Sequence, residues 1–141
     1  MTQFLYPEQV TSNVTYNLIG KRAIAGKRFR DLSSCTVIII AEDLEDEALL
    51  RNLADEILTR GCKNIVFGGG VSEEMQYIFD QEDREINGFN DITGYEDFAV
   101  TRRFGDLEQL QEEIEMCWNE VLVLCSDIAI LRECQSIVQE N

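Results

Sequence analysis

The sequence predicts an α/β domain with three layers, in which helices flank a mostly parallel sheet of about four to five strands. Two observations lead to this fold class. Short β-branched runs alternate four times with segments of helical periodicity, which is typical of βαβ units. The first run, residues 35–41, is apolar from end to end, as expected for a strand covered by helices on both faces. With 141 residues, the chain has the usual size of one domain.

The first half of the predicted sheet comes from two βα units. Residues 35–41 form the first strand, and a helix over 44–59 follows, with its apolar residues recurring on one face. Residues 64–67 form the second strand, and three glycines separate it from a helix that begins at Ser72 and runs to about Phe79.

A long connection and a short strand come next. Residues 81–97 are polar, acidic and rich in turn-forming pairs, so we expect a surface loop there. Residues 98–101 then form a third strand, which we expect to stop at Arg102 and Arg103.

Two further elements complete the pattern. A helix follows Gly105-Asp106, a fourth strand covers 120–125, and a last helix begins after Ser126-Asp127. This succession indicates a Rossmann-like or flavodoxin-like arrangement.

Residues 1–34 are open to two interpretations. Alternating apolar residues over 10–18 favour an extra strand, whereas 16–29 also has the pattern of a helix. The segment 20–28 nearly matches a phosphate-binding loop but has the wrong spacing, and we interpret it as part of a basic arm. We therefore expect one domain overall, with a basic N-terminal segment, 1–34, packed on an acidic α/β body, 35–141.

The composition restricts the function classes. The chain has five cysteines and no histidine, so Ser-His and Cys-His nucleophile pairs are excluded and reduced thiols are expected. No segment has the basic and apolar pattern of a signal peptide or the length of a transmembrane helix. We expect a cytoplasmic protein without a cofactor, and a binding role more than an enzymatic one. An edge strand or the apolar residues 4–6 could pair two copies into a homodimer.

Charge is the most unusual property of the sequence. The chain carries 12 basic and 27 acidic residues, a net charge of −15. Residues 1–34 have a net charge of +3, from five basic and two acidic residues, so the remaining 107 residues carry −18. Such a body would repel phosphates, which argues against direct nucleic-acid binding, and would attract a basic protein.

The preferred hypothesis is therefore an acidic domain that binds a basic protein partner. An immunity or antitoxin-type inhibitor of a nuclease works in this way. Like charges at helical spacing repel one another, so a sequence that keeps them can be using them to bind. The candidate partner-binding residues are Glu108, Glu112, Glu115, Asp80, Glu82 and Asp83.

Two alternatives place a site where the strands end, because ligands of open parallel sheets bind at that edge. The first is a small-molecule or nucleotide site, with candidate residues Gly68, Gly69, Gly70, Arg102 and Arg103. The second is a carboxylate enzyme that holds magnesium with Glu42, Asp43 and Asp127. The pair Glu42-Asp43 resembles the acidic pair of response-regulator receiver domains, but the phospho-acceptor aspartate and the lysine of that family are missing.

Overall fold

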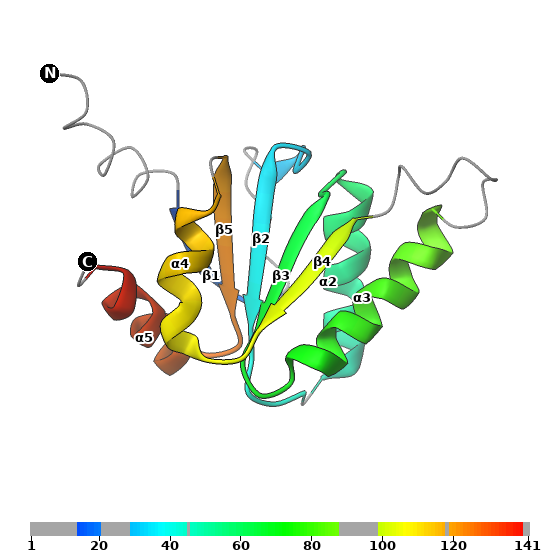
Figure 1. Cartoon of the computed structure of the whole chain (residues 1–141). Helices are drawn as coiled ribbons and strands as arrows, with labels where there is room; N and C mark the ends of the chain where they lie inside the picture. Colours follow the sequence, from blue (N-terminus) through cyan, green and yellow to red (C-terminus); the bar gives the residue numbers. More distant parts are fainter. Residues whose placement is uncertain (1–13, 21–28, 45, 88–98, 118, 140–141) are drawn as a thin grey trace, which may run out of the picture.

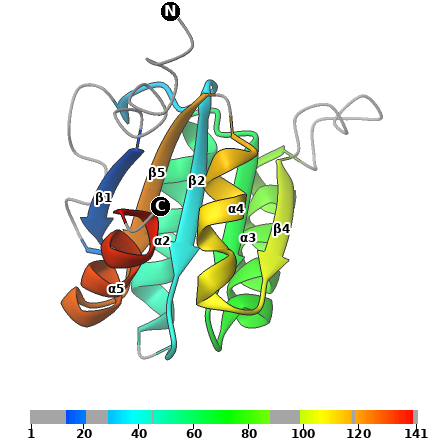
Figure 2. The same cartoon turned by 60° about the vertical axis from the view of Figure 1, so that its left-hand side comes forward.

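Five parallel strands form the sheet of this computed structural model, which describes residues 14–20, 29–44, 46–87, 99–117 and 119–139. The order across the sheet is β1-β5-β2-β3-β4, so its edges are β4 (Figure 1) and β1 (Figure 2). The strands are β1 (Val14–Leu18), β2 (Cys35–Ile40), β3 (Asn64–Gly68), β4 (Val100–Phe104) and β5 (Glu120–Cys125).

Helices cover both faces of this sheet, which confirms the predicted three-layer α/β architecture. Helices α2 (Glu47–Thr59) and α3 (Ser72–Asn87) pack on one face. The 3-10 turn η4 (Leu107–Gln109), helix α4 (Leu110–Glu115) and helix α5 (Ile128–Gln139) pack on the other (Figure 2). The arrangement is consistent with a Rossmann-like or flavodoxin-like fold.

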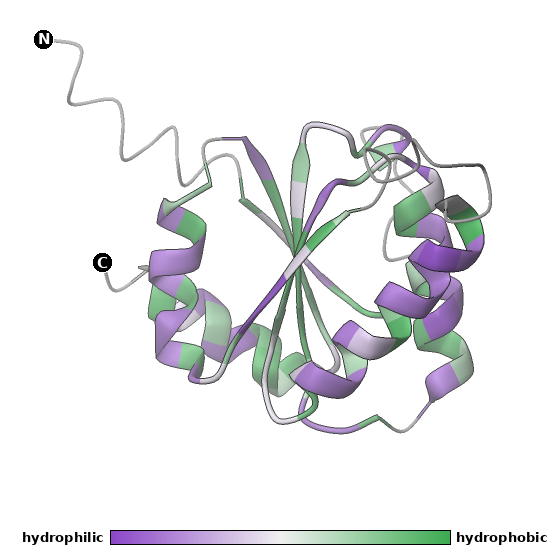
Figure 3. Cartoon of the chain, turned by 45° about the vertical axis from the view of Figure 1, so that its right-hand side comes forward, coloured by the Kyte–Doolittle hydropathy of each residue, from purple (hydrophilic) through white to green (hydrophobic). Residues whose placement is uncertain are grey.

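The alternation of side chains along each strand divides the core into two layers. In β2, Val37 and Ile39 face α2 and α3, whereas Ile38 and Ile40 face α4 and α5, and all four are fully buried. Hydrophobic residues gather on the strands and the inner sides of the helices, and hydrophilic residues face outwards (Figure 3). The continuous apolar run in the sequence therefore has the predicted cause: both faces of β2 are covered.

Helix α3 is longer than predicted, and part of the predicted loop at 81–97 is helical. The helix continues to Asn87 because its inner side stays buried beyond Phe79. Asp83 is 5% exposed, and Ile86 packs against the core with partial burial. Arg84 and Glu85 between them face solvent, so the run is polar without being a loop. Residues 88–98 lie outside the described residues.

Strand β4 is present as predicted, but its predicted end was wrong, because the strand extends through Arg102 and Arg103 to Phe104. Both arginines belong to an edge strand, where polar side chains on the two faces can reach carboxylates of the covering helices. Phe104 is buried against α4 and fixes the end of the strand. The predicted start at residue 98 lies outside the described residues.

In the N-terminal segment, residues 14–18 form a strand that pairs in parallel with β5. The extra strand was therefore the better of the two interpretations for these residues, and the helical one fails for 16–18. The basic stretch 21–28 and residues 4–6 lie outside the described residues. Among the helices that the structure describes, none combines the length and the apolar character that crossing a bilayer requires.

Candidate functional site

The chain reverses its direction of winding between β2 and β5. After β2 it continues into α2 on one face of the sheet, and after β5 it continues into α5 on the opposite face. The two strands are neighbours over their whole length. A crevice opens where neighbouring strands send their connections to opposite faces, and this is where open α/β sheets bind their ligands.

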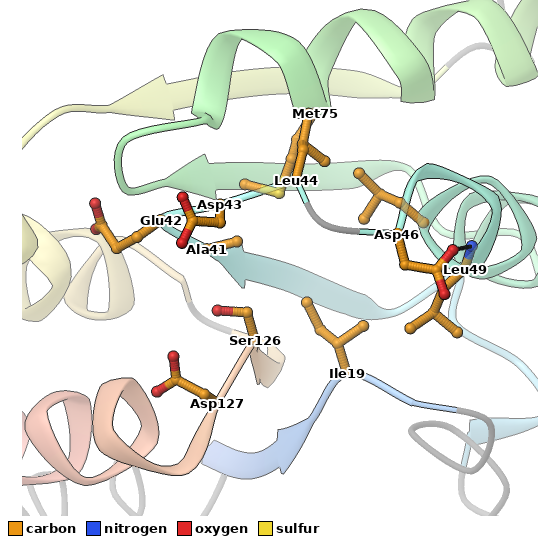
Figure 4. A pocket seen from close by; sticks show the side chains of 11 residues that line it. Ile19, Ala41, Glu42, Asp43, Leu44, Asp46, Leu49, Met75, Ser126 and Asp127 are labelled. Carbon is orange, nitrogen blue, oxygen red and sulfur yellow. Dashed lines mark hydrogen bonds between the residues drawn. The ribbon is translucent and has the colours of Figure 1, made fainter.

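A cavity of about 210 Å³ lies at this point. We call it the switch-point cavity; Figure 4 shows it between the segments that follow β1, β2 and β5 and the first turns of α2 and α3. Its lining residues are Ile19, Ala41, Glu42, Asp43, Leu44, Asp46, Leu49, Leu50, Met75, Ser126 and Asp127.

Three of the four described carboxylates around this cavity accept hydrogen bonds from backbone amides. Asp46 caps α2 by accepting from the amide of Leu49 at 2.9 Å. Asp127 accepts from the amide of Ile130 at 2.9 Å in the first turn of α5.

The third carboxylate, Glu42, accepts from the amide of Gly70 at 3.1 Å, just before α3. Helix N-termini with free amides are the usual binding sites of phosphates. In this cavity the chain's own carboxylates occupy those positions, so a phosphate would meet negative charge and few free donors.

Asp43 is the fourth carboxylate, and it differs from the other three. It is exposed and makes no hydrogen bond or ion pair within the part of the chain that the structure describes. Among the residues that the structure describes, no basic side chain lines the cavity. The cavity mouth is therefore negative, and Asp43 is available to a ligand.

The interior of the cavity is apolar. Met75 and Leu50 are buried, at 0% and 4% exposure, and Ile19 and Leu44 are partly buried against the same core. An apolar interior with a charged mouth suits a ligand that has an aliphatic part and a polar end.

A second, more open hollow of about 750 Å³ adjoins the first through Leu44 and runs between α2 and α3. We call it the helical groove. One of its lining residues is Tyr77, which is 63% exposed. Its two basic residues are already paired: Arg51 lies 3.0 Å from Glu47, and Arg103 lies 3.6 Å from Glu73.

Within the described part of the chain, the two hollows together are lined by eight exposed carboxylates and two arginines. We call these eight residues the acidic surface: Glu42, Asp43, Asp46, Glu47, Glu73, Glu74, Asp80 and Asp127. Most of them follow the carboxyl ends of strands or begin helices, so the parallel topology gathers them at one edge of the sheet.

The predicted partner-binding residues do not form one surface. Glu108, Glu112 and Glu115 are exposed on η4 and α4, whereas Asp80 and Glu82 belong to α3 on the opposite side of the sheet. The side chain of Glu82 is only 15% exposed and lies 3.3 Å from Arg51.

The expectation of an exposed carboxylate at Asp83 needs correction. Its side chain is buried and accepts a hydrogen bond of 2.8 Å from the amide of Ala99, just before β4. Asp80 is exposed and accepts from the hydroxyl of Thr101. Partial burial and the nearby Asp83 raise the pKa of Asp80, although the Thr101 hydrogen bond opposes them.

The predicted glycine-rich ligand site is filled by the protein itself. A side chain at Gly68 would place its Cβ 2.3 Å from the ring of Phe104. Gly69 has a φ of +97°, and a Cβ there would lie 2.3 Å from the carbonyl oxygen of Ala41. These glycines permit close packing, and the amide of Gly70 is already taken by Glu42.

The two arginines of that predicted site do not converge on it. Arg102 faces α4, with 2.8 Å between its Nη1 atom and Oε1 of Glu113, whereas Arg103 faces α3 and Glu73. Adjacent residues of a strand point to opposite faces, so the pair could not serve one ligand.

The predicted magnesium ligands Glu42, Asp43 and Asp127 do share the switch-point cavity. However, among the described residues, no three Cys, Asp or Glu side chains are grouped closely enough to hold a metal ion. Two of the three carboxylates are engaged with backbone amides, as described above.

Sequence reasoning missed the residues that shape the two hollows. Ile19, Leu49 and Met75 line the cavity, and Arg51 and Tyr77 line the groove. Helical spacing places Met75 on a buried face, but only the strand order brings it close to Ile19. No protein-family model matches the chain, and no curated protein or solved structure matches it either.

Proposed function

We propose that this chain is a protein-binding domain that engages a basic partner through its acidic surface. The observation that supports the proposal is the ratio of eight exposed carboxylates to two paired arginines around adjoining hollows. Such a surface steers and orients a positively charged protein. A nuclease, whose phosphate-binding face is basic, fits this charge, and the chain would then act as an immunity or antitoxin-type inhibitor.

The exposed tyrosine of the helical groove supports the same proposal. Tyrosine is enriched among the residues that dominate protein interfaces, and its ring can stack on an arginine. Tyr77 lies in the groove among Glu73, Glu74 and Asp80. An aromatic side chain surrounded by carboxylates is suited to an arginine or lysine of a partner.

We place this binding in the cytoplasm. All five cysteines are free thiols, and four of them are buried. This pattern fits a reducing compartment, where disulfides are rare.

Affinity capture from a lysate of the source organism tests the proposal. The bait variant Asp43→Asn/Glu74→Gln removes two charges from side chains that make no hydrogen bond or ion pair with the described residues, so its fold should be retained. The matched control, Glu108→Gln/Glu112→Gln, removes the same charge from the opposite face. All baits are used at about 50 and 500 mM salt, because screening weakens charge-driven contacts over that range.

We expect one basic protein to be retained by the wild type and the control at low salt and lost from the acidic-surface variant. If both variants lose the captured protein equally, net charge alone explains its binding. If only the control loses it, the partner binds at α4 and not at the acidic surface. If no basic protein is enriched by the wild type, the proposal is wrong.

A further inference from the structure

The switch-point cavity is more specific than the acidic surface around it. At about 210 Å³ it is smaller than the ~300–1,000 Å³ pockets that hold drug-sized ligands. A dinucleotide would not fit inside it. A single extended side chain has a suitable size.

The chemistry of the cavity selects a cation. Three of its carboxylates satisfy the helix-end amides that would otherwise attract an anion, so added negative charge is repelled. Asp43 makes no contact of its own within the described part of the chain. A cationic group at the mouth would gain a free carboxylate and three more carboxylates nearby.

The apolar interior selects the rest of the ligand. Ile19, Leu44 and Leu49 are partly buried and form the accessible apolar wall, and Met75 and Leu50 are buried beneath it. Lysine and arginine bury their aliphatic stems on such surfaces while their charged ends remain near water. Figure 4 shows the carboxylates and the apolar side chains around the same opening.

We propose that the switch-point cavity binds one basic side chain of the partner, with its aliphatic stem against Ile19, Leu44 and Leu49 and its cationic end beside Asp43. This inference rests on the proposed function, because the partner supplies the side chain. The helical groove would then hold the surrounding contacts, and the cavity would be the anchor of the interface.

Side-chain analogues test the cavity directly on the full chain. The ¹H–¹⁵N NMR spectrum is followed during titration with n-butylammonium, with n-butanol and butyrate as neutral and anionic controls. We expect saturable shifts of the amides of Ile19, Ala41 and Ser126, with a Kd on the order of 1–10 mM for so small a ligand. The two controls should leave these amides unchanged.

Two variants separate the cavity from general charge. Ser126→Leu fills the mouth without changing the net charge, and it should abolish the shifts. Asp43→Asn should weaken binding by roughly 2–5-fold, as expected for one exposed ion pair. Glu112→Gln, which removes a charge on α4, should bind like the wild type. Thermal melts check that each variant is folded.

The inference is overturned if n-butylammonium gives no saturable shift, if n-butanol gives the same one, or if Ser126→Leu binds equally well. It is also overturned if a Lys21→Gln/Arg22→Gln variant binds n-butylammonium about tenfold more tightly, because the chain's own basic segment would then be the occupant.

Capture with the Ser126→Leu bait distinguishes this inference from the proposed function. Reduced capture by Ser126→Leu supports the cavity as the anchor. If that bait retains the basic partner as well as the wild type does, while Asp43→Asn/Glu74→Gln loses it, the cavity is not the anchor and the proposed function stands. If no basic partner is captured at all, both proposals fail, even where n-butylammonium binds.

Discussion

The contact between Gly68 and Phe104 provides a quantitative test of why the glycines follow β3. Gly68→Ala adds a Cβ at 2.3 Å from the ring's Cζ atom and 2.8 Å from both Cε atoms. Carbon atoms pack best at about 3.5–4.0 Å, so the ring would have to move by more than 1 Å. Phe104 is 5% exposed and packs against α4, so it has little space in which to move.

We expect Gly68→Ala to lower the free energy of unfolding by about 1–2 kcal/mol. Overpacking of this kind costs about 1–3 kcal/mol, and the reduced freedom of the unfolded chain returns ~0.4–1 kcal/mol. For a chain of this length, the melting temperature should fall by roughly 3–8 °C. Urea unfolding followed by circular dichroism measures the first quantity, and a thermal melt measures the second.

Two further variants complete the test of this contact. Gly105→Ala is the control, because its added Cβ would meet nothing within 4 Å, and it should change stability by less than about 0.5 kcal/mol. Phe104→Leu makes room for the added methyl group, so a double-mutant cycle with Gly68→Ala should give a favourable coupling of ~0.5–3 kcal/mol. If Gly68→Ala is as stable as Gly105→Ala, or the cycle is additive, packing against Phe104 is not the reason for this glycine.

Three other predictions concern buried and titrating groups. Asp83→Ala should destabilise the fold by about 1–3 kcal/mol in urea unfolding, because the amide of Ala99 loses its acceptor. With a thiol reagent, Cys117 should react first in the folded protein; Cys62 should react only on unfolding, since burial raises its pKa to about 11. For Asp80, burial and the nearby Asp83 raise the folded-state pKa, so its contribution to stability is present below the ordinary carboxyl pKa and is lost as the pH rises through the folded-state value. Asp80→Asn should therefore gain stability relative to the wild type between about pH 3.5 and pH 7, and an unchanged difference over that range would refute the assignment.

The central strands could be predicted because burial leaves a direct trace in their sequence. Strand β2 is covered on both faces and is apolar throughout, and α2 shows its buried face at helical spacing. Strand β4 lies at the edge, so Arg102 and Arg103 could be tolerated inside it and looked like a stop signal. An edge strand tolerates charged residues, so its sequence lacks the continuous apolar pattern by which a central strand is predicted.

The end of α3 was missed for a related reason. Between Phe79 and Ile86, the buried side of the helix carries a carboxylate, Asp83, in place of an apolar residue. Its charge suggested solvent exposure, whereas its hydrogen bond to the segment before β4 allows burial. Such a bond cannot be recognised before the strand order is known.

The candidate site was predictable in its location but not in its composition. The rule for parallel sheets led to the strand ends and brought Glu42, Asp43 and Asp127 into one cavity. The same rule failed for the glycines and arginines, because it does not say which face each strand residue points to. The apolar wall depends on β5 lying between β1 and β2, and nothing in the sequence specifies that order.

Part of the acidity at the strand ends has a local structural cause. Asp46, Asp127 and Glu42 accept hydrogen bonds from amides at or just before helix starts, and such bonds stabilise helices whatever the protein binds. Asp43 and Glu74 make no such contact within the described residues. They nevertheless add negative charge to an edge of the sheet where the other carboxylates already repel one another. Glu74 gains some stabilisation from the helix dipole in the first turn of α3, whereas Asp43 gains none, so the repulsion at Asp43 requires another explanation, and a basic partner provides one. The variant Asp43→Asn/Glu74→Gln should therefore lose the partner while its stability falls by no more than about 1 kcal/mol, and a larger loss would mean that these carboxylates serve the fold.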